Sequence, residues 1–151
     1  MLTAQDIMTS KVITVTEDVP VTRLAAILWE NRISGVPVVD DKGEVISVVT
    51  ENDLIDQTKK LHLPTVISVL DSVIFLENPN KVEKDIEKIT GKTVKDICSK
   101  NPVIIALDTR LDEIATIMAE KKVHTLPVVS EGKLVGVVGK SDIIRTLTKK
   151  D

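Results

Sequence analysis

Two aspartates that follow apolar, β-prone segments are the residues of this chain best suited to bind a polar ligand. Thr50 and Asp53 form a Thr-x-x-Asp pattern, and Gly139 and Asp142 hold the equivalent positions in a second, similar stretch. An ionised aspartate only accepts hydrogen bonds, so it can bind both the 2′- and the 3′-hydroxyl of a ribose. The same spacing is typical of a helix capping box, with Asp in place of Glu. The two roles are compatible, and the spacing alone leaves both open.

The elements that must position these aspartates are two helices, expected to begin near Glu51 and near Ser141. The first turn of a helix offers free N–H groups and a partial positive charge, and both favour a phosphate. Gly139 lacks the hydroxyl of Thr50. Either Ser141 caps the second helix, therefore, or the second site binds its ligand differently.

A long internal repeat contains both stretches. Residues 33–55 and 123–144 each hold a Pro-Val-Val segment, a polar turn with glycine, a second apolar run and an Asp near a helix start. Residues 3–8 and 93–98 also match one another. A repeat decides the architecture before any local prediction, and two copies are too few for a solenoid. The repeat therefore predicts two halves that bury a face against each other.

Each copy is expected to have the element order β-α-β-β-α. Short β-prone runs at residues 12–15 and 103–105 come first. Apolar residues then recur at helical spacing from Val21 and from Leu111, which predicts an amphipathic helix in each copy. Two strands around a polar, glycine-containing turn follow as a hairpin, and a helix closes the copy. We expect Gly35 to mark the end of the first amphipathic helix.

The segment between the copies has no counterpart in either of them. Residues 63–76 are rich in Val and Ile and fit either a strand or a buried helix, and residues 82–89 predict a helix that Gly91 ends. Because the segment is too apolar for a linker, we expect it to cover a cleft mouth or form a dimer edge. The expected division is residues 1–60 for the first repeat, 61–91 for the inserted segment and 92–151 for the second repeat.

Composition excludes several classes of protein. The 151 residues are 42% hydrophobic and 28% charged with a net charge of −3. These values fit a folded chain without the basic surface that binds the phosphates of a nucleic acid. One Trp, one Phe and no Tyr nearly exclude aromatic stacking of single-stranded nucleic acid. The lone Cys98 precludes an internal disulfide. No signal peptide or membrane-spanning segment is visible, so we expect a cytoplasmic protein without a membrane partner.

The repeated motifs resemble the cystathionine β-synthase (CBS) domain. The resemblance rests on the Ser-Gly-Val-Pro-Val-Val and His-Thr-Leu-Pro-Val-Val segments, the hairpin glycines, and the Thr-Glu-Asn-Asp and Gly-Lys-Ser-Asp segments that open the last helices. It covers residues 1–60 and 92–151, so the whole chain is similar to a tandem CBS pair. The resemblance implies an α+β fold in which two repeats pack by pseudo-two-fold symmetry through their sheets, with two clefts between them.

The same resemblance implies a regulatory ligand and a second copy of the chain. Clefts of this family often bind AMP, ADP, ATP or S-adenosylmethionine, and CBS pairs commonly form homodimers shaped as a flat disk of four repeats. Backbone groups of the Pro-Val segments would border the adenine, and the aspartates would bind the ribose, although core packing stays an alternative for the apolar side chains. The candidate residues are Ile13, Thr14, Ile33, Ser34, Gly35, Val36, Pro37, Thr50, Asp53, Val103, Ile104, Val123, His124, Thr125, Leu126, Pro127, Lys140, Asp142 and Arg145.

Basic residues favour a phosphate in the second cleft. His124 stands where relatives often have a basic residue, Lys133 and Lys140 flank the last strand, and Arg145 lies one turn further on. The ribose-binding group is more complete in the first cleft, where both the Thr and the Asp are present. A partly buried His124 and a solvated Arg145 are the simpler alternatives.

Catalytic constellations are missing from the sequence. It has no glycine-rich phosphate loop, Cys98 with two distant histidines makes no nucleophile–base pair, and metal ligands are too few for zinc. We therefore expect a free-standing sensor of an adenosine-containing ligand and not an enzyme. The alternative is a ligand-free module for dimerisation or protein interaction.

Overall fold

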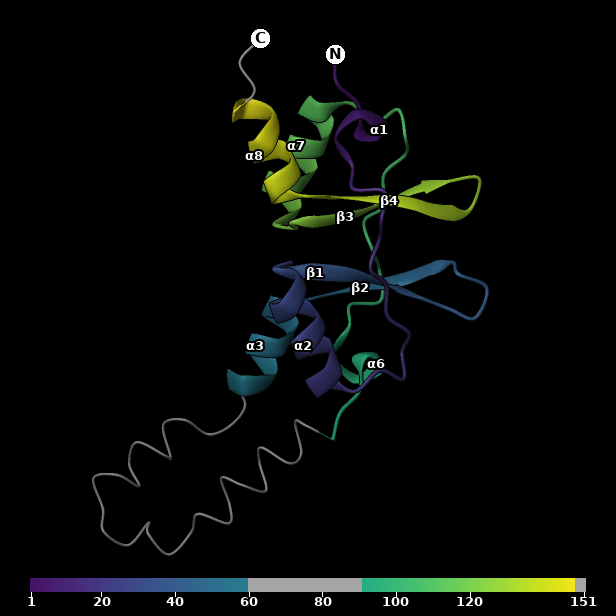
Figure 1. Cartoon of the computed structure of the whole chain (residues 1–151), viewed down its shortest axis with the longest axis vertical. Helices are drawn as coiled ribbons and strands as arrows, with labels where there is room; N and C mark the ends of the chain where they lie inside the picture. The colour runs from purple at the N-terminus through teal and green to yellow at the C-terminus, as the bar shows by residue number, and fades with distance from the viewer. Residues whose placement is uncertain (60–90, 149–151) are drawn as a thin grey trace, which may run out of the picture.

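The computed structural model describes residues 1–59 and 91–148. It shows two similar halves stacked along the long axis, with their sheets facing each other in the middle and helices on the outer side of each sheet (Figure 1). The predicted α+β fold of two repeats related by a pseudo-two-fold axis is therefore confirmed. The elements predicted at 63–76 and 82–89, and most of the inserted segment, lie outside the described residues.

Corresponding elements occur in the same order in both halves. The first half of the sequence contains α1 (Ala4–Ile7), α2 (Val21–Asn31), β1 (Gly35–Val39), β2 (Val45–Thr50) and α3 (Glu51–Lys59). The second contains α6 (Val94–Ile97), α7 (Leu111–Lys121), β3 (Thr125–Ser130), β4 (Lys133–Gly139) and α8 (Lys140–Thr148).

Both predicted hairpins form, but the predicted first strands do not. β1 pairs antiparallel with β2, and β3 with β4. Of residues 12–15 and 103–105, only Val15 and Ile105 make a bridge, each parallel to the first strand of its hairpin. Val15 is 4% exposed, whereas Ile13 before it is 36% exposed. The run stays short because one residue alone is buried against the hairpin.

The short helices α1 and α6 pack on the opposite half from the one their sequence position suggests (Figure 1). The Ala4 N–H donates to the Thr109 carbonyl at 2.8 Å, and the backbones of Thr9 and Val137 exchange two hydrogen bonds of 2.9 and 3.0 Å. Likewise, the Val94 N–H donates to the carbonyl of a first-half residue, Val19, at 2.9 Å. The two halves therefore exchange their leading segments.

This exchange joins the two cores. Ala4 and Ile7 are buried in the core of the second half, with Ile114, Leu126 and Val138. Correspondingly, the core of the first half contains two second-half side chains, which are Val94 and Ile97.

Gly35 does not end a helix, contrary to our expectation. α2 ends at Asn31, and Arg32 caps it in the left-handed conformation at φ 53°. Gly35 instead begins β1, where an added Cβ would lie 2.7 Å from Thr125 Oγ1 and 3.2 Å from the Val49 carbonyl oxygen. A glycine is needed because β1 and β3 approach each other closely where the two halves meet.

Candidate functional site

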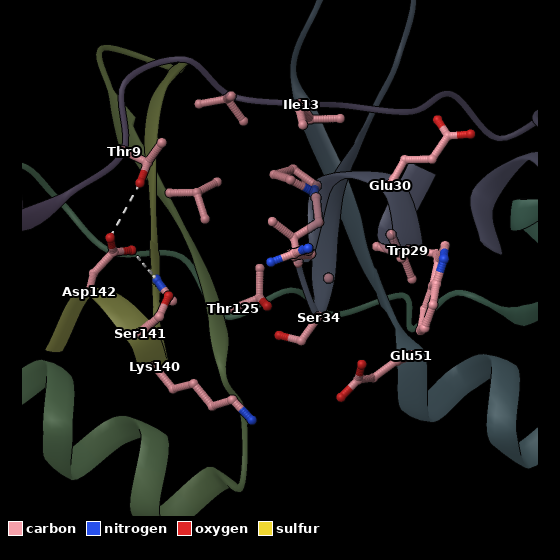
Figure 2. A pocket seen from close by; sticks show the side chains of 18 of the residues that line it. Thr9, Ile13, Trp29, Glu30, Ser34, Glu51, Thr125, Lys140, Ser141 and Asp142 are labelled. Carbon is pink, nitrogen blue, oxygen red and sulfur yellow. Dashed lines mark hydrogen bonds between the residues drawn. The ribbon is translucent and has the colours of Figure 1, made fainter. Parts of the chain in front are cut away.

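A pocket of about 1070 Å³ opens between the two halves and takes residues from both. Figure 2 shows Ile13 and Ser34 of the first half facing Thr9, Lys140 and Asp142 across the space. Pockets of this size with an apolar lining and a few polar groups are typical of small-molecule sites. The residues that line it are Thr9, Lys11, Val12, Ile13, Ala25, Leu28, Trp29, Glu30, Arg32, Ile33, Ser34, Gly35, Pro37, Glu51, Leu54, Thr125, Val137, Gly139, Lys140, Ser141 and Asp142.

Asp142 is the most buried charged group of this lining, with 5% of the residue exposed. Its Oδ2 accepts the Gly139 N–H at 2.7 Å, which is the capping contact. Its Oδ1 accepts from the Thr9 hydroxyl at 3.3 Å and from the Arg145 guanidinium at 3.0 Å. The carboxylate therefore caps α8 and also lies at the pocket wall.

The start of α8 supplies the polar groups beside Asp142. Lys140 is the first residue of this helix, and its exposed side chain extends into the space between the walls (Figure 2). Ser141 lies inside the first turn and lines the pocket. The capping contact of the helix comes from Asp142, so the alternative of a Ser141 cap is not what the structure shows.

Asp53 has a different environment from Asp142. Its Oδ2 accepts both the Thr50 N–H at 2.8 Å and the Thr50 hydroxyl at 3.2 Å. Partial burial raises the pKa of the Asp53 carboxyl above its ordinary value, the hydrogen bonds from Thr50 oppose that rise, and the nearby Asp56 adds to it. Asp53 and Thr50 are not among the residues that line the described pocket.

The pocket takes its two walls from different repeats. We expected Lys140 to add positive charge to the second of two clefts, and the structure places Lys140 and Asp142 opposite residues 33–37 of the first copy. The cause is the close packing of Gly35 against Thr125, which brings the start of β1 next to the end of β4. Residues of one copy therefore do not form a complete site among themselves.

The predicted site residues separate into three groups. Eight of them line the pocket, namely Ile13, Ile33, Ser34, Gly35, Pro37, Thr125, Lys140 and Asp142. Val36, Leu126 and Pro127 are buried, which fits the alternative that these side chains pack in the core. Thr14, Thr50, Asp53, Val103, Ile104, Val123, His124 and Arg145 do not line this pocket.

Two basic candidates, His124 and Arg145, do not line the pocket. His124 is exposed, and its carbonyl accepts the Lys140 N–H at 3.2 Å. The Arg145 guanidinium pairs with Asp142 and also donates to the Ile7 carbonyl at 3.2 Å. Arg145 therefore holds the carboxylate and the N-terminal segment together, which differs from both alternatives in the sequence analysis, a phosphate contact and a solvated helix face.

Sequence reasoning missed several lining residues, above all Thr9 and Trp29. Thr9 is brought to the pocket by the exchange of leading segments, for which the sequence contains no signal. Trp29 falls on the polar side of the amphipathic pattern of α2, and that position was the sequence signal for contact with a ligand or partner; in the structure Trp29 is 85% exposed.

The comparison with family models identifies the class. The CBS domain model matches residues 4–60 and 94–149, which are the two repeats. The chain therefore belongs to the CBS domain family. No helix within residues 1–59 and 91–148 has the length and apolar character needed to cross a membrane.

Curated relatives include a plant protein and an archaeal protein. The chain is 33% identical over 128 residues to the chloroplastic CBS domain-containing protein CBSX1 of Arabidopsis thaliana, covering 79% of this chain and 52% of CBSX1. It is 27% identical over 153 residues to the uncharacterized protein MJ1426 of Methanocaldococcus jannaschii, covering 95% of this chain and 89% of that protein. The chain thus spans about half the length of CBSX1.

Among solved structures, CBSX2 in complex with AMP has a TM-score of 0.72 to this chain and 27% sequence identity. The match covers 97% of this chain and 96% of that one. The similarity extends over both repeats, so the pairing of the halves is shared.

Proposed function

We propose that this chain is a regulatory CBS pair that binds an adenosine-containing ligand, such as AMP, ADP, ATP or S-adenosylmethionine, between its halves. The observation that carries the proposal is the buried Asp142 carboxylate at the wall of a pocket built from both repeats. CBSX2, a relative with the same pairing of repeats, has been solved with AMP.

The lining suggests how each part of such a ligand would bind. Asp142 would accept the ribose hydroxyls, because an ionised carboxylate accepts two hydrogen bonds from neighbouring hydroxyls. Ile13, Ile33 and Pro37 would contact the faces of the adenine, and the backbone of residues 33–37 would bind its edge. A phosphate would lie near Lys140 and the first turn of α8, where the helix dipole favours an anion.

Regulation follows if the ligand has different affinities for two arrangements of the halves. Because the pocket has one wall from each repeat, a bound ligand favours the arrangement that brings both walls into contact with it. We propose that the downstream readout is a change in assembly or in a partner's binding, and that the chain itself is not catalytic.

A ligand screen tests this function directly. Melting temperature is measured with AMP, ADP, ATP, S-adenosylmethionine and NADH, and at a concentration 100-fold above the dissociation constant a ligand stabilises the folded state by about 2.7 kcal/mol. Trp29, the only tryptophan, lines the pocket and reports binding by fluorescence. Asp142→Asn keeps the size of the side chain and should weaken the response. No stabilisation by any compound would contradict the proposal and favour a ligand-free interaction module.

We also propose that the chain forms a homodimer. Large apolar side chains are exposed on three helices: Trp29 of α2 is 85% exposed, Ile55 of α3 60%, and Ile144 and Leu147 of α8 58% and 78%. Such a surface favours association. Sedimentation at several concentrations measures the state, and Ile144→Glu combined with Leu147→Glu should shift it toward monomer. A monomeric wild-type protein at all concentrations would contradict this proposal.

We also propose that the protein is located in the cytoplasm. The lone Cys98 and the absence of any possible internal disulfide are compatible with a reducing compartment. Cell fractionation with the full chain is the test, and recovery in a membrane or organelle fraction would overturn this location.

A further inference from the structure

The Asp142 carboxylate is shared by three parts of the molecule. Gly139 at the end of β4 donates its N–H to Oδ2 at 2.7 Å, and Arg145 of α8 donates to Oδ1 at 3.0 Å. The third donor is the hydroxyl of Thr9, at 3.3 Å from Oδ1, which comes from the exchanged N-terminal segment (Figure 2).

The N-terminal segment, here residues 3–9, is attached at this point in two ways. The Thr9 hydroxyl donates to Asp142 directly, and the Ile7 carbonyl accepts from the Arg145 guanidinium at 3.2 Å. Arg145 and Asp142 are themselves an ion pair. The side-chain anchor of the N-terminal segment therefore includes the carboxylate that faces the pocket.

A ligand with two neighbouring hydroxyls would compete for this carboxylate. A carboxylate offers about four acceptor positions, and three are used by Gly139, Arg145 and Thr9. One acceptor position therefore remains on the carboxylate, whereas a ribose diol brings two donors. The Thr9 bond is the longest of the three, and Thr9 is exposed, so its hydroxyl can turn to water at little cost. Thr9 is thus the donor that a diol displaces.

Resting on the function proposed above, we infer that Thr9 competes with the ligand's diol for Asp142, so that occupancy of the pocket releases a side-chain anchor of the N-terminal segment. Thr9 is then a residue that sets affinity for ribose-containing ligands, and residues 3–9 respond to binding. Thermodynamic linkage makes the effect reciprocal: anchoring the segment weakens the ligand to the same degree as the ligand weakens the anchor.

The first half does not repeat this arrangement. Among residues 1–59 and 91–148, Asp53 accepts hydrogen bonds from Thr50 alone, at 2.8 and 3.2 Å on the same oxygen. Asp56, three residues further along, occupies the place that Arg145 has after Asp142, so a like charge replaces the ion pair. The competition is therefore specific to Asp142.

The test compares Thr9→Val with the wild-type chain in titrations of AMP and of 2′,3′-dideoxy-AMP, followed by Trp29 fluorescence. Valine keeps the shape of threonine and suits an exposed β-bridge. Thr9→Val should bind AMP about two- to tenfold more tightly, as expected for one competing hydrogen bond. Its affinity for the dideoxy compound should equal that of the wild type. Thr9→Ser, which keeps the hydroxyl, should bind both compounds like the wild type.

Hydrogen–deuterium exchange tests the response of the N-terminal segment. AMP should speed exchange at residues 3–9 of the wild type and leave this segment of Thr9→Val unchanged. Equal affinities of wild type and Thr9→Val for AMP, or equal exchange changes in both, would overturn this inference while leaving the proposed function intact. A wild-type chain that fails to bind AMP and the other adenosine compounds would instead overturn the proposed function, and this inference with it.

Discussion

At the scale of single residues, the two aspartates of the repeat differ in what surrounds their charge. Asp142 has the Arg145 guanidinium as a counter-ion at 3.0 Å. Asp53 has no cation beside it among the described residues and faces Asp56. The sequence shows this contrast once the repeats are aligned, because Asp56 and Arg145 hold equivalent positions. The loss of the Thr50 hydroxyl in the second repeat is compensated by Thr9, which the alignment does not show.

Asp53→Asn should stabilise the protein at neutral pH. Since burial raises the pKa of the Asp53 carboxyl, the folded state binds this proton more tightly than the unfolded state. The ionised form therefore destabilises the fold above the folded-state pKa, and this penalty disappears as the pH falls below 3.8, the ordinary value. Asparagine can still accept the Thr50 N–H. Unfolding by urea between pH 3 and pH 7 measures the difference, which should grow as the pH rises.

Asp6→Asn is the matched control and should behave in the opposite way. Hydrogen bonds from the backbone and side chain of Thr3 lower the pKa of the Asp6 carboxyl. Its contribution to stability is present above the ordinary pKa and is lost as the pH falls through the folded-state value. Equal pH profiles for the two variants would show that burial does not govern Asp53.

Gly139→Thr should raise the stability of the second half. A Cβ at Gly139 would lie 3.6 Å from the His124 carbonyl oxygen and 3.7 Å from Asp142 Oδ2, which are ordinary contacts. The new hydroxyl could donate to Asp142 as Thr50 does to Asp53, so we expect a gain of about 0.5–1.5 kcal/mol in the free energy of unfolding. Gly136→Thr is the control and should destabilise, because its Cβ would overlap Met8 Sδ and lie 2.9 Å from Met8 Cγ. A loss of stability for Gly139→Thr would show that the glycine has another role.

At the scale of elements, the sequence predicts the two hairpins and the helix starts well. The patterns around Pro37 and Pro127 and the turn glycines are local, and local chemistry decides these elements. The short runs before the helices were overpredicted, since only Val15 and Ile105 find a strand to pair with. The role of Gly35 was also missed, because its contact with Thr125 joins residues far apart in the chain.

Gly35→Ala should force β1 away from β3 and destabilise the protein by about 1–3 kcal/mol, the usual cost of overpacking. The added Cβ would lie 2.7 Å from Thr125 Oγ1. Thr125→Ala removes that oxygen, so the double variant should recover part of the loss, and the two substitutions should not be additive. Urea unfolding of the wild type, both single variants and the double variant gives the coupling. Additive effects would contradict the close approach of the two strands.

At the scale of the whole molecule, the halves of the sequence and the halves of the structure differ. Residues 3–8 match residues 93–98 as part of the repeat, but each segment packs on the core of the other half. Similarity between repeats cannot show this, because a segment looks the same whichever core it joins. Thr9 was missing from the predicted site for the same reason, because it reaches Asp142 from the exchanged segment.

Because the leading segments are exchanged, a destabilising substitution in the leading segment of one repeat should loosen the hairpin of the other repeat. Ile7 is 4% exposed in the second core, and Ile97 is 8% exposed in the first. Truncation of a buried isoleucine to alanine costs about 2–5 kcal/mol. Hydrogen–deuterium exchange should therefore speed up in β3 and β4 for Ile7→Ala and in β1 and β2 for Ile97→Ala. If each variant instead loosened the hairpin of its own repeat, the exchange of segments would be wrong. The contact of Thr9 with the pocket would then also be wrong, because only an N-terminal segment docked on β4 brings the Thr9 hydroxyl to Asp142.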